Sequence, residues 1–356
     1  MKSYLILILN FGSTSTKIAI YENLEEKNRI IINHPIEDLK KFQTIWDQEN
    51  YRKEKIKETI LKNHYDMRNF SAISCRGGTV KPVPSGVYLL NEEMIKDMRS
   101  GKYGVHPTNV GNAIVFKLGK EVGIPVIIAD PPTTDEMSDI ARLSGIKEIE
   151  RISSFHALNQ KRTARKVSED LGIDYQQINL VVVHLGGGIS VAAHQKGIVV
   201  DVNNALDGDG PFSPERAGTL PAGALIKMCY SGRYTETEMM EKVRSKGGLM
   251  SYLGTSSGLE VEKRIDNGDQ YALKIVEAMA YQISKEIGAM SAVLKGEIKA
   301  IVLTGGFANF DTLVTLIKDH ISFISNVYVY PGENEILSLA ENAFRYLSGK
   351  VVAKKY

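Results

Sequence analysis

Residues 180–188 read LVVVHLGGG, a short run of β-branched and apolar residues that stops at a histidine and a glycine triplet. Three other apolar runs, 4–9, 124–129 and 300–303, stop in the same way at a polar or glycine-rich cluster. Runs of this length and composition are typical of buried strands. Because ligands in open α/β sheets bind beyond the carboxyl ends of the strands, the four clusters mark the predicted site.

The sequence contains an internal echo of this stretch. Residues 9–13, LNFGS, align with residues 183–187, VHLGG, at an offset of 174 positions (184 minus 10). Each segment is followed by a second β-like run, at 18–21 and at 189–193, so each half of the chain is predicted to begin with a hairpin. The offset is too long for a solenoid repeat, and it favours two related domains that face one cleft.

The small residues in these turns favour phosphate binding. They let a backbone approach an anion closely, and N–H groups can then cradle it. A third glycine cluster, Thr304-Gly305-Gly306, follows another predicted strand. The chain has neither the Walker P-loop pattern nor the Gly-x-Gly-x-x-Gly dinucleotide pattern. We therefore expect these loops to grip a polyphosphate in a different way.

Helical stretches separate the predicted strands. Residues 269–295 place apolar residues at spacings of three and four, as in a long amphipathic helix. A second helix is expected at 154–171 with the serine pair 153–154 as caps, and a third at 333–348 with an acidic start. The Lys- and Glu-rich segment 22–66 is interpreted as a solvated helical face.

The composition narrows the possible classes of protein. With 356 residues the chain is long enough for two domains, and 43% apolar and 24% charged residues are ordinary globular values. The formal net charge of +2 gives no reason to expect a nucleic-acid partner. Two cysteines exclude a disulfide framework and fit a reducing cytoplasm. No apolar run approaches the ~20 residues that a membrane span needs, so no membrane association is expected.

Taken together, the motifs resemble those of the acetate and butyrate kinase family, within the larger class of sugar kinases, actin and Hsp70-type ATPases. The resemblance covers nearly the whole chain and includes segments 9–17, 106–109, 154–156, 184–188 and 201–218. The last segment, with its DVNNALDG and PERAG motifs, is the most specific. It resembles the butyrate-type members of the family more than the acetate-type members.

The resemblance implies an α/β fold of two ribonuclease H-like domains, of the kind found in actin, Hsp70 and sugar kinases, with a nucleotide cleft between them. We expect the first domain, on the side of the acyl substrate, to comprise residues 1–150 plus 335–356, and the second, nucleotide-binding domain to comprise residues 151–334. The implied reaction is a direct, reversible, in-line transfer of phosphate from ATP to butyrate, isobutyrate or a similar branched short-chain acid. Its products are the acyl phosphate and ADP, and the implied cofactor is Mg²⁺. The implied location is the cytoplasm, and the implied assembly is a homo-oligomer, a dimer or larger.

The resemblance also implies three catalytic residues, Arg76, His156 and Arg216. A short carboxylate is already ionised at pH 7, so it needs no general base, but two anions must be held together. Arginine suits carboxylate and phosphate oxygens, and His156 is expected to hydrogen-bond the transferring phosphoryl group. Two departures stand out: Gly187 replaces an asparagine of the acetate kinases, and Arg76 lies directly before two glycines.

The remaining implied site residues fall into three groups. The nucleotide and its phosphates are expected to contact Asn10, Gly12, Ser13, Ser15, His184, Gly186, Gly187, Gly188, Gly305, Gly306 and Asn309. Mg²⁺ uses few protein carboxylates besides phosphate oxygens, and those expected on its side are Asp130 and Glu335. The acyl chain of the substrate is expected to lie beside Val105, His106, Phe155 and Leu206.

Three alternatives stay open at this stage. In the first, the substrate is acetate or propionate, since one methylene group changes specificity by only about 1–3 kcal/mol. In the second, the protein is a sugar-type kinase that uses Asp130 as the base for a hydroxyl acceptor. In the third, it is a nucleotide-binding regulator without turnover, although the sequence shows no added interaction module. Trapping an acyl phosphate with hydroxylamine separates the carboxylate kinases from the other two classes.

Overall fold

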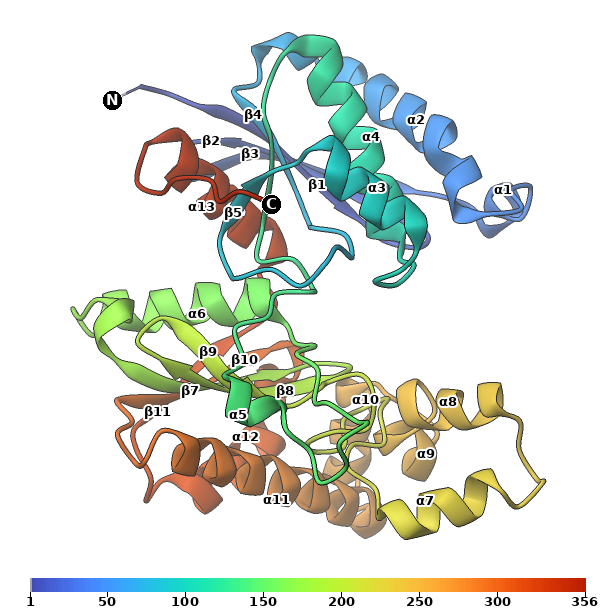
Figure 1. The fold of residues 1–356 in the computed structure, drawn as a ribbon, viewed down its shortest axis with the longest axis vertical. Helices are drawn as coiled ribbons and strands as arrows, with labels where there is room; N and C mark the ends of the chain where they lie inside the picture. Colours follow the sequence, from blue (N-terminus) through green and yellow to red (C-terminus); the bar gives the residue numbers. More distant parts are fainter. Residues whose placement is uncertain (1) are drawn as a thin grey trace. The chain divides into compact units, whose positions relative to one another are not determined.

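The computed structural model describes residues 2–356 and shows a chain divided into two compact units (Figure 1). Unit 1 contains the chain up to Thr134 and the C-terminal segment Asn334–Tyr356, and unit 2 contains Asp135–Glu333. The chain therefore leaves unit 1 once and returns to it for its last helix. Within residues 2–356, no helix is long and apolar enough to cross a bilayer.

The segment 135–150, expected in the first domain, belongs to unit 2. The carboxylate of Glu136 accepts hydrogen bonds from the Val199 N–H at 3.0 Å and from Lys161 Nζ at 2.5 Å. Lys161 is only 1% exposed, and a buried ammonium group needs such a partner. This buried pair fastens the segment to unit 2.

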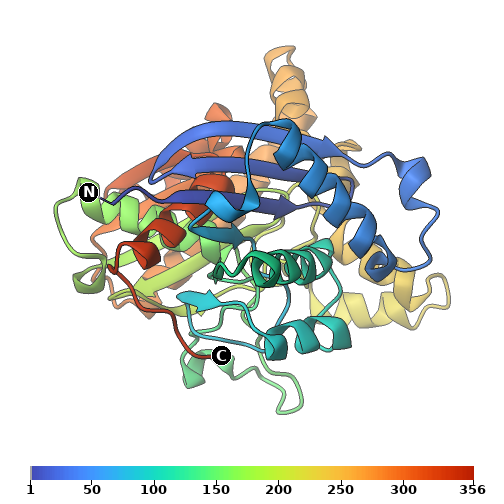
Figure 2. The same ribbon diagram turned by 90° about the horizontal axis from the view of Figure 1, so that it is seen from above.

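Unit 1 is built on a six-stranded mixed sheet with the strand order β3-β2-β1-β4-β6-β5. The first three strands form an antiparallel meander, which Figure 2 shows side by side in dark blue, while β4 runs parallel to β1 and β6 parallel to β4. The strands are β1 (Leu5–Phe11), β2 (Ser15–Glu22), β3 (Glu25–Asn33), β4 (Ala72–Cys75), β5 (Val87–Leu89) and β6 (Val126–Ala129).

Unit 2 repeats this plan in a five-stranded sheet of order β11-β10-β7-β8-β9. Again the first three strands form an antiparallel meander, and the next two run parallel to the strand beside them. The strands are β7 (Asn179–Leu185), β8 (Ile189–Gln195), β9 (Ile198–Val202), β10 (Ala300–Gly305) and β11 (Val327–Pro331).

The predicted internal echo is confirmed by the strand positions. β1 begins at Leu5 and β7 at Asn179, while β2 begins at Ser15 and β8 at Ile189. Both pairs differ by 174 positions (179 minus 5, and 189 minus 15). Each sheet therefore starts with the same hairpin, and the four predicted strands are present as β1, β6, β7 and β10.

Helices cover both faces of the first sheet (Figure 1). α4 and α13 both pack on β1 and β4 from opposite faces, and α2 and α3 pack against α4. The helices of unit 1 are α1 (Ile36–Leu39), α2 (Glu49–Lys62), α3 (Glu92–Ser100), α4 (Pro107–Val122) and α13 (Glu335–Leu347).

In unit 2, α6 covers one face of the sheet, and α11 and α12 cover the other (Figure 1). The three predicted helices are present as α6, α11 and α13. The helices of unit 2 are α5 (Asp139–Arg142), α6 (Ala157–Asp170), α7 (Ala222–Cys229), α8 (Glu236–Arg244), α9 (Gly248–Leu253), α10 (Gly258–Asp266), α11 (Gln270–Val293) and α12 (Asp311–Ile321).

The interpretation of segment 22–66 as a helical face is wrong for its first part. Glu25–Asn33 forms the edge strand β3, in which every second residue is half-buried toward its end. Ile30 and Ile32 pack onto the buried core of unit 1. Ile31 between them is exposed, so burial alternates along the strand, and the run of three β-branched residues favours a strand over the helix that the Lys- and Glu-rich composition suggested.

The expected capping of the helix at 154–171 is also wrong. α6 begins at Ala157, and its N-cap is His156, without a side-chain capping bond. The Ser154 carbonyl O instead accepts a hydrogen bond from the Ala205 N–H at 2.9 Å. The serines therefore belong to the approach to the helix, and His156 itself stands at the helix start.

Gly111 marks a close contact between α4 and the first sheet. A Cβ atom at this position would lie 2.2 Å from the Phe11 ring, whereas a Cβ at Gly288 in α11 would meet nothing within 4 Å. We expect Gly111→Ala to lower the free energy of unfolding by about 1–3 kcal/mol, the usual cost of overpacking. Gly288→Ala should raise it by up to about 1 kcal/mol, since alanine favours helix. Urea unfolding measures both changes, and equal stability of the two variants would contradict this packing.

Candidate active site

Two hairpin turns occupy equivalent places in the two sheets. Between β1 and β2 the Gly12 N–H donates to the Ser15 carbonyl O at 2.8 Å, and between β7 and β8 the Gly186 N–H donates to the Gly188 carbonyl O at 3.2 Å. Each turn thus presents small residues at the end of a buried strand. The hairpins are as predicted from the sequence, and their contact with a nucleotide stays a prediction.

The third glycine cluster lies against the hairpin of unit 2. Gly305 has a φ of +93°, and a Cβ atom there would lie 2.3 Å from the Leu185 carbonyl O, so only glycine fits. Gly306 opens the short 3₁₀ turn that follows β10. The Asn309 side chain donates to the Gly306 carbonyl O at 3.0 Å. These three predicted residues therefore form one turn beside the glycine hairpin.

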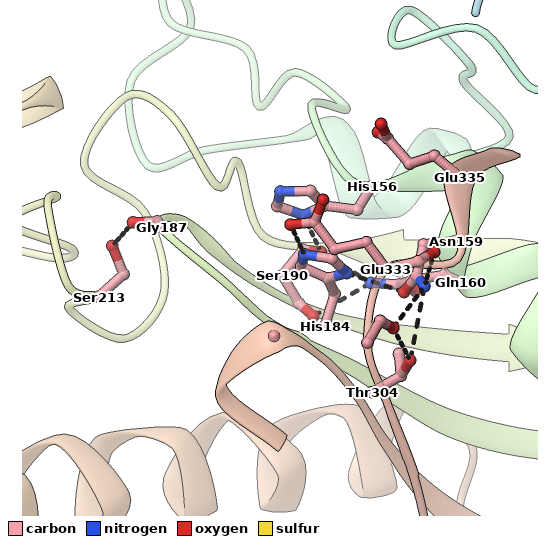
Figure 3. Close-up of polar contacts among 12 residues, drawn as sticks. His156, Asn159, Gln160, His184, Gly187, Ser190, Ser213, Thr304, Glu333 and Glu335 are labelled. Atoms are coloured by element: carbon pink, nitrogen blue, oxygen red, sulfur yellow. Dashed lines mark hydrogen bonds and ion pairs between the residues drawn. The ribbon is translucent and has the colours of Figure 1, made fainter. Parts of the chain in front are cut away.

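Two predicted histidines, His156 and His184, stack on each other in unit 2. Their ring centroids lie 3.7 Å apart, with an angle of 11° between the planes (Figure 3). His184 is 1% exposed, and its Nδ1 lies 2.8 Å from Oδ1 of Asn159, whose Nδ2 donates to the Glu333 carbonyl O at 2.8 Å. Because a carbonyl only accepts, the latter bond fixes the Asn159 amide and assigns a proton to His184 Nδ1. His184 is thus a buried support for the more exposed His156 ring.

A chain of hydrogen-bonded polar side chains leads from Tyr175 to His156. The carbonyl O and Oγ of Ser190 accept from Gln160 Nε2 at 3.0 and 2.8 Å (Figure 3). This leaves Gln160 Oε1 to accept from His194 Nε2 at 3.0 Å. Burial lowers the pKa of His194 well below its usual value, so its ring is neutral and Nδ1 accepts from the Tyr175 hydroxyl at 2.7 Å. Ser190 Oγ lies 2.9 Å from His156 Nδ1, which is the acceptor that this network offers to the Ser190 O–H. With the bond in this direction, a neutral His156 carries its proton on Nε2.

Arg216 lies directly against the glycine hairpin of unit 2. A Cβ atom on Gly188 would lie 1.7 Å from Arg216 Nη1, so the absence of a side chain at Gly188 makes room for the guanidinium. Nη1 donates to the Ala205 carbonyl O at 2.5 Å, and within residues 2–356 the buried Nε has no hydrogen-bond partner. Burial lowers the pKa of Arg216, while Glu215 and Asp207 act in the opposite direction. The Nη2 group is not among the buried atoms and has no hydrogen-bond partner within residues 2–356, so it is a donor available to an anion.

In unit 1 the structure brings together three residues that the sequence places far apart. Glu335, the first residue of α13, accepts from Asn10 Nδ2 through Oε2 at 2.7 Å and pairs with Arg76 Nη1 through Oε1 at 3.0 Å. The Arg76 carbonyl O accepts from the Asn112 side chain at 2.9 Å. His106 is the N-cap of α4. Burial and the positive charge of Arg76 lower the pKa of His106, while the negative charge of Glu335 raises it. These predicted residues form one polar group at the end of the first sheet.

Asp130, predicted as a magnesium ligand, follows β6 in a left-handed conformation with φ +43°. It is 4% exposed; its Oδ1 accepts from the Gly86 N–H at 2.8 Å, and its own N–H donates to the Gly86 carbonyl O at 3.0 Å. One of its oxygens therefore secures a turn. Within residues 2–356 no three His, Cys, Asp or Glu side chains gather as a metal site, so a magnesium ion would depend on phosphate oxygens.

The residues expected beside the acyl chain differ in exposure. Val105 is 68% exposed and Leu206 is 36% exposed, so both are available to a ligand. Phe155 is 6% exposed and packs in a buried cluster with Met137 and Val199. The structure thus gives Phe155 a core position, and contact of these side chains with an acyl chain stays a prediction.

Sequence reasoning missed three residues that support the site, namely Arg52, Gln160 and Ser190. Arg52 is buried on the face of α2 that also buries Ile56, and that spacing of four is visible in the sequence. Gln160 lies one helical turn after His156, on the buried face of α6. The spacing that buries Arg52 and Gln160 was therefore visible in the sequence. It was not used, because arginine and glutamine in a polar helix are ordinarily solvent-exposed.

Two comparisons with known sequences show the family to which the chain belongs. A model described as the acetokinase family matches residues 145–334. The chain is 50% identical over 354 residues to a protein named probable butyrate kinase from Clostridium botulinum (strain Eklund 17B / Type B). That alignment covers 99% of this chain and 100% of the relative.

Two solved structures resemble the fold. The structure of Porphyromonas gingivalis acetate kinase matches with a TM-score of 0.78 and 18% identity, covering 96% of this chain and 99% of the other. A propionate kinase from Francisella tularensis subsp. tularensis SCHU S4 matches with a TM-score of 0.75 and 18% identity, covering 95% and 98%. At these identities the likeness concerns the fold alone, and it confirms the predicted α/β fold with two domains.

Proposed function

The chain belongs to the acetokinase family and is a carboxylate kinase, and we propose that it transfers the γ-phosphate of ATP to butyrate or a similar short-chain acid. The products are the acyl phosphate and ADP, and the reaction is reversible. The observation that supports the proposal most strongly is the Arg216 guanidinium, which is partly buried, lies against a glycine hairpin and keeps Nη2 without a hydrogen-bond partner within residues 2–356. Such a group suits an anion that gains charge during transfer.

The chemistry requires stabilisation of charge and not removal of a proton. A short-chain acid is ionised at pH 7, so its carboxylate oxygen attacks phosphorus without a general base. We assign to Arg216 the phosphoryl oxygens in transfer. We assign to His156 a hydrogen bond from Nε2–H to the same group, since the Ser190 bond leaves the proton on that nitrogen. Both groups are fixed before the ligand arrives, which keeps the cost of reorganisation low.

We assign to unit 1 the second positive group and the carboxylate for magnesium. The oxygens of Glu335 are held by Asn10 and Arg76, which fixes the direction of the carboxylate. One carboxylate with phosphate oxygens and waters is an ordinary donor set for Mg²⁺, so these residues fit the ion. When bound, Mg²⁺ supplies neutralisation of phosphate charge. Arg76 is the proposed partner of the substrate carboxylate, and Asp130 stays a proposed second carboxylate on the magnesium side.

A hydroxylamine trap tests the proposal across a panel of acids. With ATP and Mg²⁺ we expect hydroxamate formation from C3 to C5 acids, with a higher kcat/KM for butyrate than for acetate. Glycerol and glucose serve as hydroxyl acceptors and should give no ATP-dependent phosphorylation. Absence of hydroxamate with every C2 to C5 acid would defeat the carboxylate kinase function, and a highest kcat/KM with acetate would replace butyrate as the substrate.

We also propose a homo-oligomer located in the cytoplasm. α7 supports the assembly, because this apolar helix buries none of its residues within its own chain. The cysteines Cys75 and Cys229 form no disulfide, which suits a reducing compartment. Light scattering of the purified protein measures its mass in solution.

A further inference from the structure

Arg52 on α2 is a buried cation whose hydrogen-bond partners are all uncharged. It is the largest of the fully buried side chains among residues 2–356, at 2% exposed. Nε donates to Gln48 Oε1 at 3.0 Å, and Nη1 and Nη2 donate to the carbonyl oxygens of Gly12 and Ser13 at 3.0 and 2.5 Å. In the described part of the chain, no carboxylate pairs with it, and burial lowers its pKa.

Two other buried charges in this protein do have partners of opposite sign. Lys161 binds Glu136 at 2.5 Å. Glu49, one turn before Arg52 on the same helix, pairs with Arg99 at 2.6 Å. A buried charge without a counter-charge is costly for folding. The stability of the fold alone therefore does not explain why a charged residue is buried at position 52.

The loop that Arg52 binds, Gly12–Thr14, turns its acceptors inward and its donors outward. Its first two carbonyl groups accept from Arg52, and the third, of Thr14, accepts from the His34 N–H at 2.8 Å. The N–H groups of its last two residues donate to no other group within residues 2–356, and both residues are exposed. The free surface of the loop thus offers N–H and hydroxyl groups, which suit an anion.

The histidine beneath the loop shows the sign of the local field. His34 is 2% exposed and is hydrogen-bonded to Thr16 Oγ1 at 2.9 Å. Burial and the positive charges of Arg52 and Lys55 lower the pKa of His34 to about 4. His34 is therefore neutral at pH 7, and the charges that act on it are positive. The region under the loop carries an excess of positive charge.

We propose that Arg52 is a positioning residue of the loop Gly12–Thr14, and that the phosphate groups of a bound nucleotide balance its charge. The inference rests on the proposed function for the identity of that nucleotide. Arg52 acts through the loop: it holds the carbonyl oxygens away from the surface, so phosphate oxygens meet donors only. The positive charge of Arg52, on the inner side of the loop, also attracts the phosphate groups.

The substitution Gln48→Glu tests this while leaving Arg52 in place. It puts a carboxylate where Gln48 Oε1 now accepts from Arg52 Nε, so it keeps the loop bonds and neutralises the charge. We expect the Kd of the non-hydrolysable ATP analogue AMPPNP to rise about tenfold. This is the expected effect of adding one negative charge near the phosphates at an effective dielectric constant of about 20. The midpoint of thermal unfolding should stay equal or rise. Gln43→Glu, the same change at an exposed position, is the control and should change Kd by less than about twofold.

Two variants of Arg52 complete the test. Arg52→Met should weaken AMPPNP binding more than Gln48→Glu, and Arg52→Lys should recover part of the loss. A purely structural arginine predicts wild-type affinity in Gln48→Glu. Wild-type affinity in Gln48→Glu therefore overturns the inference. If Gln48→Glu does not fold but Arg52→Met does, wild-type affinity in Arg52→Met overturns it instead. The hydroxylamine trap on the wild-type protein judges the proposed function separately, so the two failures are distinguishable.

Discussion

Arg216→Ala is expected to lower kcat for acyl phosphate formation about 10²–10³-fold, the usual loss when a donor to developing charge is removed. The expectation follows from how the guanidinium is held. Nη1 is fixed on the Ala205 carbonyl O at 2.5 Å in the space that Gly188 leaves open. The Nη2 group, which has no hydrogen-bond partner among residues 2–356 and is not closed off from solvent, is the proposed donor to a phosphoryl oxygen.

The rate of hydroxamate formation from ATP and butyrate measures the effect, and thermal unfolding checks that the variant is folded. Arg233→Ala is the matched control, because Arg233 is exposed in the same unit and its Nε bonds the Ser231 hydroxyl. Arg216→Lys keeps the charge but loses the planar fork, so its rate should fall between wild type and alanine. A folded Arg216→Ala variant within threefold of the wild-type rate would remove Arg216 from the proposed machinery.

His156→Ala is expected to lower kcat about 10²-fold, with a similar fall in kcat/KM, since a bond made mainly in the transition state affects both. The ring is held between His184 at a centroid distance of 3.7 Å and the Ser190 hydroxyl at 2.9 Å. His320→Ala on α12 is the control, because His320 is an exposed histidine of the same unit. An unchanged kcat with a raised KM for ATP would give His156 a binding role instead.

The support of His156 can be tested apart from the ring itself. Ser190→Ala removes the hydroxyl that donates to Nδ1, and we expect kcat to fall about five- to tenfold, the worth of one hydrogen bond. Nitrogen NMR of labelled histidine should show the Nε2–H form of His156 in the wild type and a mixture of both tautomers in Ser190→Ala. A wild-type ring protonated on Nδ1 would disprove the proton order derived from Gln160 and Ser190.

The strands and hairpins could be predicted because their signals are local. A run of apolar residues followed by small ones at 5–15 and at 179–189 indicates a buried strand and a tight turn without knowledge of the rest of the chain. Their equal spacing revealed the duplication of the sheet. The edge strand β3 was missed because its first five residues are polar and its only apolar residues are three consecutive isoleucines, so composition dominated the interpretation.

The long-range part of the site could not be derived from spacing. Glu335 binds Asn10 across 325 positions, a contact that exists because α13 packs back on the first sheet. The family resemblance singled out both residues but not their bond. Arg52 escaped detection for a related reason: its partners lie 40 and 39 positions away, on a loop that was itself correctly predicted.

In the proposed reaction an oxygen of the acid attacks the γ-phosphorus of ATP directly. Phosphorus NMR of a reaction with ATP, Mg²⁺ and ¹⁸O-labelled butyrate tests this step. Direct attack should give ADP and butyryl phosphate in equal amounts, with the phosphorus signal of the acyl phosphate shifted by a bridging ¹⁸O. Formation of AMP and pyrophosphate, or of ADP with inorganic phosphate and no acyl phosphate, would contradict it.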